Sequence, residues 1–185
     1  MPLGQEPSEI LQEKLVYRGR KFDYRVLHLR LPNGVEGDWE CVRHPGGALA
    51  VPVTADGRFV LVRQYRFAFA GRLLEFPAGT VEVGEEPSAT IRREIEEETG
   101  YSADNWQHLG DFPLAPGYSD EIIYAYLATG LTKLEQPPAQ DEDEDIEVVL
   151  MTAAELEAAI AAGEAIDAKT VTAYFLARQV LGPEA

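Results

Sequence analysis

The residues best suited to chemistry are four glutamates within five positions: Glu94, Glu96, Glu97 and Glu98. They come just before Gly100, a residue type that favours the end of a helix. A helix turns by about 100° per residue, so Glu94, Glu97 and Glu98 share one face. Hard divalent cations such as Mg²⁺ take oxygen ligands, so this face, beside a glycine loop, predicts a metal site.

The negative charge at this helix end needs compensation. Like charges three or four residues apart cost roughly 0.2–0.5 kcal/mol per pair, and each carboxylate in a last turn costs about 0.3–1 kcal/mol against the helix dipole. One interpretation is a solvated acidic face, balanced in part by the pairs Arg92–Glu96 and Arg93–Glu97. The other is a bound cation, which would compensate the charge directly.

Length and charge limit the class of protein. The chain has 185 residues, 45% of them hydrophobic, which is enough for one sizeable core. Its formal net charge of −16 opposes contact with nucleic-acid phosphates or an anionic membrane surface, so we expect neither partner. The same charge repels an anionic substrate. If the substrate is a phosphate ester, metal ions or a few well-placed arginines must reverse the field locally.

Three features bear on the cellular compartment. Cys41 is the single cysteine, so no disulfide is expected within the chain. Residues 1–14 have no apolar signal core, and no stretch is as long as a membrane span. We therefore expect a soluble, cytoplasmic protein.

The elements that must position the glutamates begin with an N-terminal sheet. Residues 15–45 alternate in a strand-like way around a turn at Pro32–Gly34, and predict antiparallel strands. So small a sheet cannot stand alone. It either extends the main body or packs on a second chain as a dimerisation arm. We therefore divide the chain into a β segment, residues 1–45, and a main domain, residues 46–185.

The main domain combines strands and helices in mixed order. Asp56-Gly57 predicts the turn of a second hairpin, and "LLEFPAG" predicts a short strand that ends in a glycine loop. Pro87 and Gly100 suit the first position and the C-terminal cap of the glutamate helix. Further strands are expected at 106–112, 121–128 and 145–151, followed by a helix with a Thr152–Glu155 capping box and a last helix to about Leu181. This order predicts an α+β fold with mixed sheets between helices.

The region around the glutamates resembles a known family. The pattern consists of Gly79, Glu85, Arg93-Glu94-Ile95, Glu97-Glu98, Gly100 and Tyr101 at fixed spacing. It resembles the complete Nudix box, and a match at nine positions is far more specific than a lone glycine-rich loop. The resemblance implies a loop–helix–loop that holds metals against a diphosphate linked to a nucleoside, within a Nudix-type α/β/α sandwich.

The same resemblance implies roles for individual residues. The implied ligands for two or three Mg²⁺ or Mn²⁺ ions are three carboxylates and one backbone carbonyl: Glu94, Glu97, Glu98 and Ala78. Arg93 is implied to orient the box carboxylates, by pairing with Glu85, and so counts with Glu97 among the catalytic residues. Glu82 is a weaker candidate, since it is equally an ordinary polar loop residue.

Residues outside the box bear on the substrate. Pro116 lies sixteen positions beyond Gly100, in the segment "LAPGYSDE", and Glu121 follows it. A proline at this distance, followed by glycine and an acidic residue, is similar to the ADP-ribose pyrophosphatase subgroup, where the acidic residue lies near the substrate. Asp120 is the neighbouring alternative to Glu121. Without the box, Pro116-Gly117 would indicate an ordinary turn between strands.

Two arginines and two aromatic residues complete the implied substrate site: Arg43, Arg66, Trp39 and Tyr17. In similar enzymes the two arginine positions contact the dinucleotide, and a purine needs an aromatic surface for stacking. Arg63 and Arg66 face opposite ways on a strand, so only one of them can line the pocket. The alternatives are surface ion pairs for the arginines and core positions for the aromatic residues. Similar enzymes exchange the N-terminal sheet between subunits, which implies a homodimer.

A general base is expected on an acidic segment. Similar enzymes carry, on a mobile loop, a glutamate that closes over the metals, and here the run Asp141–Asp145 precedes a strand. Glu144 is the first candidate, Glu142 belongs to the same run, and Glu121 is the second choice. A solvated acidic loop is the alternative interpretation of the run.

The resemblance therefore predicts metal-dependent hydrolysis of the diphosphate bond of ADP-ribose, giving AMP and ribose 5-phosphate. The alternatives are another nucleotide sugar such as GDP-mannose, oxidised nucleoside triphosphates, and a non-catalytic ADP-ribose sensor. The intact carboxylate set argues against a sensor, and "LAPGYSDE" with the long N-terminal strands argues against triphosphates. Three histidines show no ligand spacing and receive no role: His28, His44 and His108.

Overall fold

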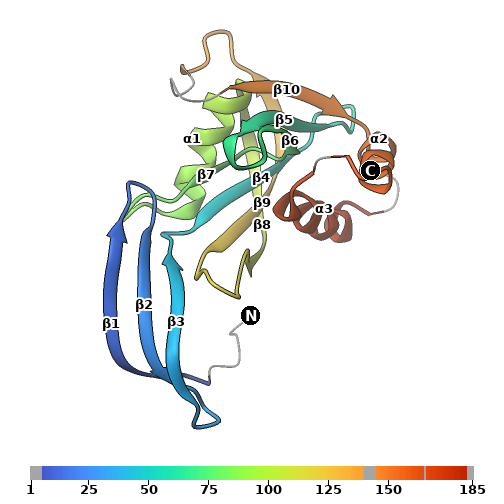
Figure 1. The fold of residues 1–185 in the computed structure, drawn as a ribbon. Helices are drawn as coiled ribbons and strands as arrows, with labels where there is room; N and C mark the ends of the chain where they lie inside the picture. Colours follow the sequence, from blue (N-terminus) through green and yellow to red (C-terminus); the bar gives the residue numbers. More distant parts are fainter. Residues whose placement is uncertain (1–5, 140–144, 165, 183–185) are drawn as a thin grey trace.

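The computed structural model describes residues 6–139, 145–164 and 166–182, and Figure 1 shows its elements. The strands are β1 (Glu9–Arg18), β2 (Asp23–Arg30), β3 (Glu36–Arg43), β4 (Gly47–Pro52), β5 (Phe59–Arg66), β6 (Gly71–Glu75), β7 (Ala78–Thr80), β8 (Tyr101–Pro113), β9 (Ile122–Lys133) and β10 (Ile146–Met151). The helices are a short 3-10 turn, η1 (Phe67–Phe69), and α1 (Pro87–Thr99), α2 (Ala153–Ala161) and α3 (Ala168–Leu181).

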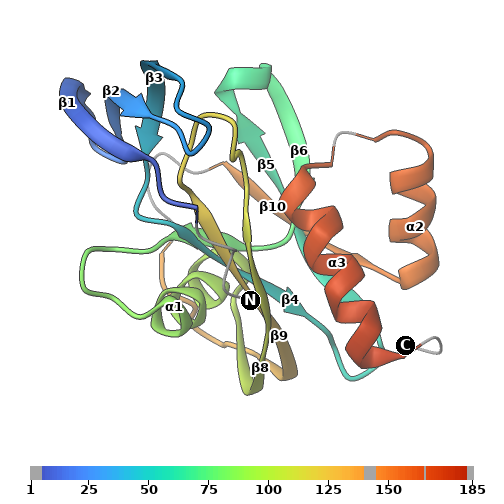
Figure 2. The ribbon, with the colours of Figure 1, turned by 90° about the horizontal axis from the view of Figure 1, so that it is seen from below.

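Three sheets make up the described fold. The order β1-β2-β3 forms an N-terminal antiparallel sheet, β10-β5-β6 a second sheet, and β7-β4-β9-β8 a third sheet in which β4 and β9 run parallel. Figures 1 and 2 show α1 on one side of the third sheet and α3, with α2 beyond it, on the other. The main domain is therefore an α/β/α sandwich with mixed sheets, as expected.

Strand β4 explains why helices cover both faces of the third sheet. All six of its residues are buried. Ala48 and Ala50 pack in a cluster with the isoleucines of α1. Leu49 and Val51 point the other way, into the larger cluster shared with α3. A strand buried on both faces is a continuous apolar run, because neither set of alternating side chains meets water.

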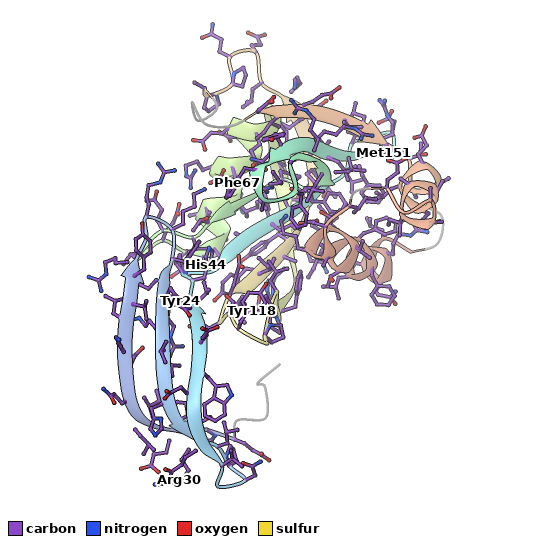
Figure 3. The ribbon with its side chains drawn as sticks, viewed as in Figure 1. Tyr24, Arg30, His44, Phe67, Tyr118 and Met151 are labelled. Atoms are coloured by element: carbon purple, nitrogen blue, oxygen red, sulfur yellow. The ribbon has the colours of Figure 1, made fainter. Side chains whose placement is uncertain are left out.

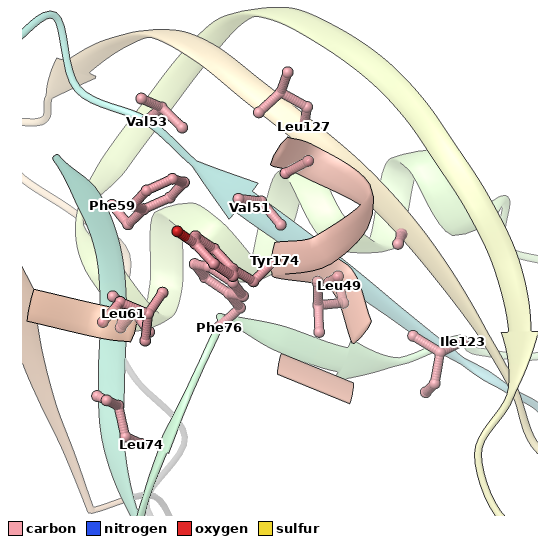
Figure 4. Close-up of a cluster of buried hydrophobic side chains, with 14 residues drawn as sticks. Leu49, Val51, Val53, Phe59, Leu61, Leu74, Phe76, Ile123, Leu127 and Tyr174 are labelled. Atoms are coloured by element: carbon pink, nitrogen blue, oxygen red, sulfur yellow. The ribbon is translucent and has the colours of Figure 1, made fainter. Parts of the chain in front are cut away.

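The larger cluster is built around an aromatic group. The ring of Phe59 packs edge-on against Phe76 and Tyr174, with ring centroids 6.1 and 5.4 Å apart. Figure 4 shows these rings with Val51 and Leu61 around them. Burying a side chain of this size contributes about 1.5–3 kcal/mol. Because Phe76 directly follows β6, the cluster also fixes the start of the loop that leads to β7.

The turn at Asp56-Gly57 is present, but the hairpin predicted around it is not. Gly57 has a φ of 78°, which suits a tight turn. The two flanking strands, β4 and β5, belong to different sheets and are joined only by the isolated bridge Val53↔Phe59. Strand β4 and the first half of β5 are apolar on both faces. Each strand has two hydrogen-bonded neighbours elsewhere, β7 and β9 for β4, β6 and β10 for β5. The prediction of a second hairpin was therefore wrong beyond its turn.

Local signals place the helix ends. Pro87 begins α1, and Gly100 caps it in the left-handed region with a φ of 67°. The capping box of Thr152 and Glu155 is formed at the start of α2, and α3 ends at Leu181. These predictions are confirmed. None of the helices within the described ranges is long and apolar enough to cross a membrane.

The N-terminal sheet projects from the main domain (Figure 1). Every residue of β1 is exposed. Backbone hydrogen bonds tie the end of β3 to the loop after β8, from Val42 N to Tyr118 O at 2.8 Å and from Asp120 N to Val42 O at 3.3 Å. The chain passes from β3 to β4 between Arg43 and Gly47, the region in which the sequence predicts the division between its two parts.

Candidate active site

The carboxylate face of α1 packs against the loop at the start of β7. Glu98 is 2% exposed, and the side chains of Glu94 and Glu97 are 13% and 27% exposed. Glu98 Oε2 accepts a hydrogen bond from Ala78 N at 3.0 Å. Burial of glutamates that belong to a helix end is unusual for a solvated acidic face. The structure therefore favours the functional interpretation of this helix.

Gly79 makes this packing possible. A β-carbon built on Gly79 would overlap the carboxylate of Glu94. Any other residue would push the Glu94 side chain away from the loop. The backbone of Ala78 and Gly79 thus lies directly against the carboxylates of Glu98 and Glu94.

Arg93 ties the box carboxylates together. Its Nη1 donates to Glu94 Oε1 at 2.8 Å and to Glu97 Oε2 at 2.9 Å, and its Nη2 lies 3.8 Å from Glu85 Oε2. Burial lowers the pKa of Arg93, but the charges of Glu94 and Glu97 outweigh this effect and raise it. A hydrogen bond with the Thr90 side chain lowers the pKa of Glu85, and Arg93 lowers it further.

The donor chemistry of this face suits a hard cation. Its side-chain donors are all carboxylate oxygens, which Mg²⁺ and Mn²⁺ prefer. Within the described ranges, no three carboxylate, imidazole or thiol groups already converge on one point as a metal would require. Glu94 and Glu97 instead converge on Arg93. A bound cation would therefore draw these two carboxylates away from the guanidinium.

Glu121 lies beside the same loop. A β-carbon built on Gly47 would stand 3.5 Å from the carbonyl oxygen of Gly79 and 3.7 Å from Glu121 Oε1, so both groups flank Gly47. His44 Nδ1 lies 3.5 Å from Glu121 Oε1 and accepts a hydrogen bond from Gly46 N. His44 received no role from the sequence, because Glu121 lies beside it in space but far from it along the chain.

The partners of Asp120 differ from those of Glu121. Its Oδ2 accepts from Arg43 Nη1 and its Oδ1 from His44 N, both at 2.9 Å. Arg43 also lies 3.9 Å from Glu13 of β1. Asp120 therefore fastens the loop to the end of β3, and Glu121 is the acid of this pair that lies next to the box loop.

Pro116 lies in the turn of this loop. The carbonyl of Ala115 accepts from Tyr118 N at 3.1 Å and from Ser119 N at 2.9 Å, which closes the turn around Pro116-Gly117. In Figure 3, His44 and Tyr118 lie where the end of β3 meets this loop. The loop thus joins the N-terminal sheet to the region of Glu121.

Arg66 and Arg63 face opposite ways, as the strand pattern predicts. Arg66 forms a two-point contact with Glu75, from Nε to Oε1 at 2.6 Å and from Nη2 to Oε2 at 2.7 Å. Arg63 lies 3.8 Å from Glu164. The hydrogen bond with Glu75 is the main cause that raises the pKa of Arg66, and the charge of Glu98 contributes. Through Glu75, Arg66 contacts the segment that leads into the box.

Trp39 and Tyr17 lie on opposite faces of the N-terminal sheet. Trp39 is registered with Leu27, and Tyr17 with Tyr24. Leu27 and Tyr24 are three residues apart on β2, and directly opposed residues share a face. The two aromatic side chains cannot form one stacking surface within a single chain. Trp39 shares its face with Arg43, four positions further along β3.

Glu142 and Glu144 lie outside the described residues. Glu82 is exposed, and its backbone N–H donates to Glu85 Oε2 at 3.3 Å. Glu75 was not predicted as a site residue; it is 1% exposed and binds Lys169 as well as Arg66. A charged residue inside the apolar run "LLEFPAG" was the signal that could have revealed it.

Several known proteins are similar to this chain over most of its length. Residues 43–174 match the NUDIX domain model. An ADP-ribose pyrophosphatase of Bacillus subtilis is 38% identical over 91% of this chain and 90% of its own length. A methanol dehydrogenase activator of Bacillus methanolicus is 38% identical over 90% of each chain. A crystal structure of an ADP compounds hydrolase superposes with a TM-score of 0.81 at 25% identity, over 95% of each chain.

Proposed function

The chain belongs to the NUDIX domain family, and from this premise we propose that it hydrolyses the diphosphate bond of ADP-ribose to AMP and ribose 5-phosphate. The observation that carries the proposal is the packing of the Glu94 and Glu98 carboxylates on the Ala78-Gly79 loop. The name of the Bacillus subtilis relative supports the choice of ADP-ribose.

We propose that two or three Mg²⁺ or Mn²⁺ ions bind at this loop. Their ligands would be the carboxylates of the α1 face and a backbone carbonyl: Glu94, Glu97, Glu98 and Ala78. Such ions neutralise a diphosphate and acidify bound water. Arg93 holds the carboxylates of Glu94 and Glu97 together on one side of the helix, so both are gathered before a cation binds.

A glutamate must accept the proton of the attacking water, a step typically worth about 10²–10⁴-fold in rate. Glu144 is the first candidate from the sequence. Glu121 is the candidate among the described residues, because its Oε1 lies beside the box loop and its side chain is 21% exposed. Asp120 is less suited, since Arg43 and the His44 backbone already occupy its oxygens.

Arginine and aromatic side chains would bind the rest of the substrate. Arg66 brings positive charge to the side of Glu98, and Arg43 to the loop of Pro116. Each arginine is paired with a carboxylate, Glu75 or Asp120. Both therefore offer guanidinium N–H donors to an anionic substrate, and the bound metal ions would supply the net positive charge. Trp39 lies on the same sheet face as Arg43 and is the better of the two stacking candidates. Tyr17 lies on the opposite face, so it could stack on a base only at a site on that face or in a second chain.

We also propose a homodimer built through the N-terminal sheet, active in the cytoplasm, where the Cys41 thiol stays reduced. Residues 1–45 carry seven Lys or Arg and seven Asp or Glu, so the whole net charge of −16 comes from residues 46–185. A neutral sheet with exposed Leu15, Val16 and Tyr17 can approach the acidic domain of a second copy without net repulsion. The exposed apolar side chains would be buried there.

The test is the release of AMP from ADP-ribose with and without Mg²⁺, beside GDP-mannose, NADH and 8-oxo-dGTP at equal concentration. A clear preference for ADP-ribose with Mg²⁺ supports the proposal. Preference for another compound would keep the metal site and refute the interpretation of Pro116. If none of the compounds is hydrolysed but ADP-ribose still binds, the protein is a sensor and not an enzyme.

A further inference from the structure

Glu75 is a buried charge to which the proposed function gives no task. It ends β6, is 1% exposed, and lies four positions before Gly79. Arg66 of β5 and Lys169 of α3 both reach its carboxylate. Buried ion pairs are weak evidence for stability, because desolvation offsets much of the attraction between the charges. The position of this cluster next to the box loop suggests a functional reason.

Glu75 holds Arg66 in one orientation. Nε and Nη2 of the guanidinium donate to the two carboxylate oxygens at 2.6 and 2.7 Å. Two parallel bonds fix the plane of a guanidinium. Nη1 then points away from Glu75, and among the residues that the structure describes it makes no hydrogen bond. The Arg66 side chain is 38% exposed, so this edge can meet a ligand.

Lys169 anchors the carboxylate of Glu75. It is itself 9% exposed, and its Nζ binds Glu75 and also Asp167, the N-cap of α3. The neighbouring Thr170 Oγ1 accepts a hydrogen bond from Phe76 N at 2.9 Å. Burial raises the pKa of Glu75, but its two cationic partners outweigh this effect and hold the pKa below the ordinary value. The start of α3 thus fixes an ionised carboxylate.

The oriented guanidinium lies on the side of the α1 carboxylates. Arg66 bonds the carboxylate of Glu75, the residue at which β6 ends. Glu98 also accepts from Ala78 N, three positions after Glu75. Arg66 and the carboxylate face therefore flank the same segment, 75–79. A guanidinium edge in this place matches the oxygens of a phosphate group.

We propose that Glu75, anchored by Lys169, is a positioning residue that presents the free edge of Arg66 to a phosphate of the substrate. This inference rests on the proposed function, because it assumes a nucleoside diphosphate derivative at the box. The competing explanation is that the cluster only fastens α3 to β6. In that case its loss would lower stability and leave substrate binding unchanged.

A double-mutant cycle separates the two explanations. Steady-state kinetics with ADP-ribose and Mg²⁺ would compare the wild type with Glu75→Gln, Arg66→Lys and the double variant. Each single variant should raise KM about tenfold with a smaller change in kcat, because the lost contact is a binding contact. The double variant should be no worse than Arg66→Lys alone, since Glu75 acts through Arg66. Additive losses, or an unchanged KM in Glu75→Gln, would overturn the inference.

Substrate binding can also be measured apart from catalysis, and a control variant shows whether any loss is specific to Glu75. Calorimetric titration of ADP-ribose without metal should show weaker binding in Glu75→Gln and in Arg66→Lys, whatever the state of catalysis. Asp56→Asn is the matched control, because it removes the carboxylate from an exposed Arg58 pair at the turn before β5 and should leave KM unchanged. Should Glu75→Gln fail to fold, Lys169→Met tests the anchor, and a normal KM in that variant would contradict it.

Failure of the inference differs from failure of the proposed function. A wild-type protein that does not hydrolyse ADP-ribose contradicts the proposed function. A wild-type protein that hydrolyses ADP-ribose, beside a folded Glu75→Gln variant with normal KM, contradicts only the role of Glu75.

Discussion

The carboxylate of Glu94 occupies the space that a β-carbon on residue 79 would require, because Gly79 lies directly against α1. Glu98 makes a second contact with the same loop, from Oε2 to Ala78 N at 3.0 Å. Loop backbone and helix carboxylates thus touch at two successive residues. The geometry of the proposed metal site depends on both contacts, and each can be tested by itself.

Gly79→Ala should reduce activity more than stability. The new methyl group must displace the Glu94 side chain, which is flexible enough to move without unfolding the protein. A metal ligand displaced by about 1 Å can cost about 10²-fold in rate. We expect kcat for ADP-ribose to fall by about this factor while the melting temperature changes little. Gly71→Ala is the control, since the nearest atom to its β-carbon is 3.7 Å away, and equal activity in the two variants would contradict the prediction.

Glu98→Gln should abolish metal-dependent turnover and leave the fold intact. The amide keeps the size of the side chain and can still accept from Ala78 N, but it loses the negative charge that a cation needs. Metal ions supply several kcal/mol of charge stabilisation, so we expect a loss of at least about 100-fold in kcat. Glu96→Gln is the matched control, because this residue of α1 lies off the shared face. A Glu98→Gln enzyme with normal activity would refute the metal site.

Local signals in the sequence were enough to predict α1 and the shared face of its carboxylates. Pro87 and Gly100 act on the backbone of their own helix, and the spacing of Glu94, Glu97 and Glu98 fixes a shared face whatever surrounds it. The same holds for the capping box at Thr152. Such features depend on neighbours within four residues, which a sequence displays directly.

Features that join distant segments were not predictable in this way. The turn at Gly57 was visible, but the choice of different sheets by β4 and β5 depends on β9 and β10, far along the chain. The contact between Glu75 and Lys169 joins residues 94 positions apart. No local pattern encodes such a pair, because it arises only when the sheets and α3 pack.

The general base can be identified by comparing Glu144→Gln with Glu121→Gln. The sequence places Glu144 first, and the structure places Glu121 beside Gly47 and the box loop. Loss of the base should lower kcat by about 10²–10⁴-fold and remove the acidic limb of the pH–rate profile. A large loss in Glu144→Gln with a small one in Glu121→Gln supports the sequence-based order, and the opposite result reverses it. Comparable small losses in both would exclude both residues as the base.

Glu75 should make stability sensitive to acid. Burial raises the pKa of Glu75, but Arg66 and Lys169 lower it by more. The pKa in the folded protein therefore lies below the ordinary value of 4.5. Its contribution is therefore complete above pH 4.5 and is lost as the pH falls through the folded-state pKa.

Urea unfolding between pH 3 and pH 7 measures this contribution. Below pH 4.5 the unfolding free energy of Glu75→Gln should fall less steeply than that of the wild type, by at most one proton or about 1.4 kcal/mol per pH unit. Glu135→Gln, at an exposed glutamate, is the control. Identical slopes for the wild type and Glu75→Gln would show that Glu75 is not ionised in the folded protein.

Leu15→Asp should weaken the proposed dimer. Leu15 is 41% exposed on β1, and a charge there opposes burial against a second acidic copy. Sedimentation equilibrium should give the wild type twice the chain mass of 20.4 kDa and shift Leu15→Asp toward one chain. Phe175→Asp, on α3 and 63% exposed, should leave the dimer intact.

A wild type with the mass of a single chain would contradict the dimer. If the N-terminal sheet of one chain also forms part of the substrate site of the other, KM should rise when the dimer dissociates. Trp39 and Arg43, the proposed substrate contacts, lie on the same sheet as Leu15.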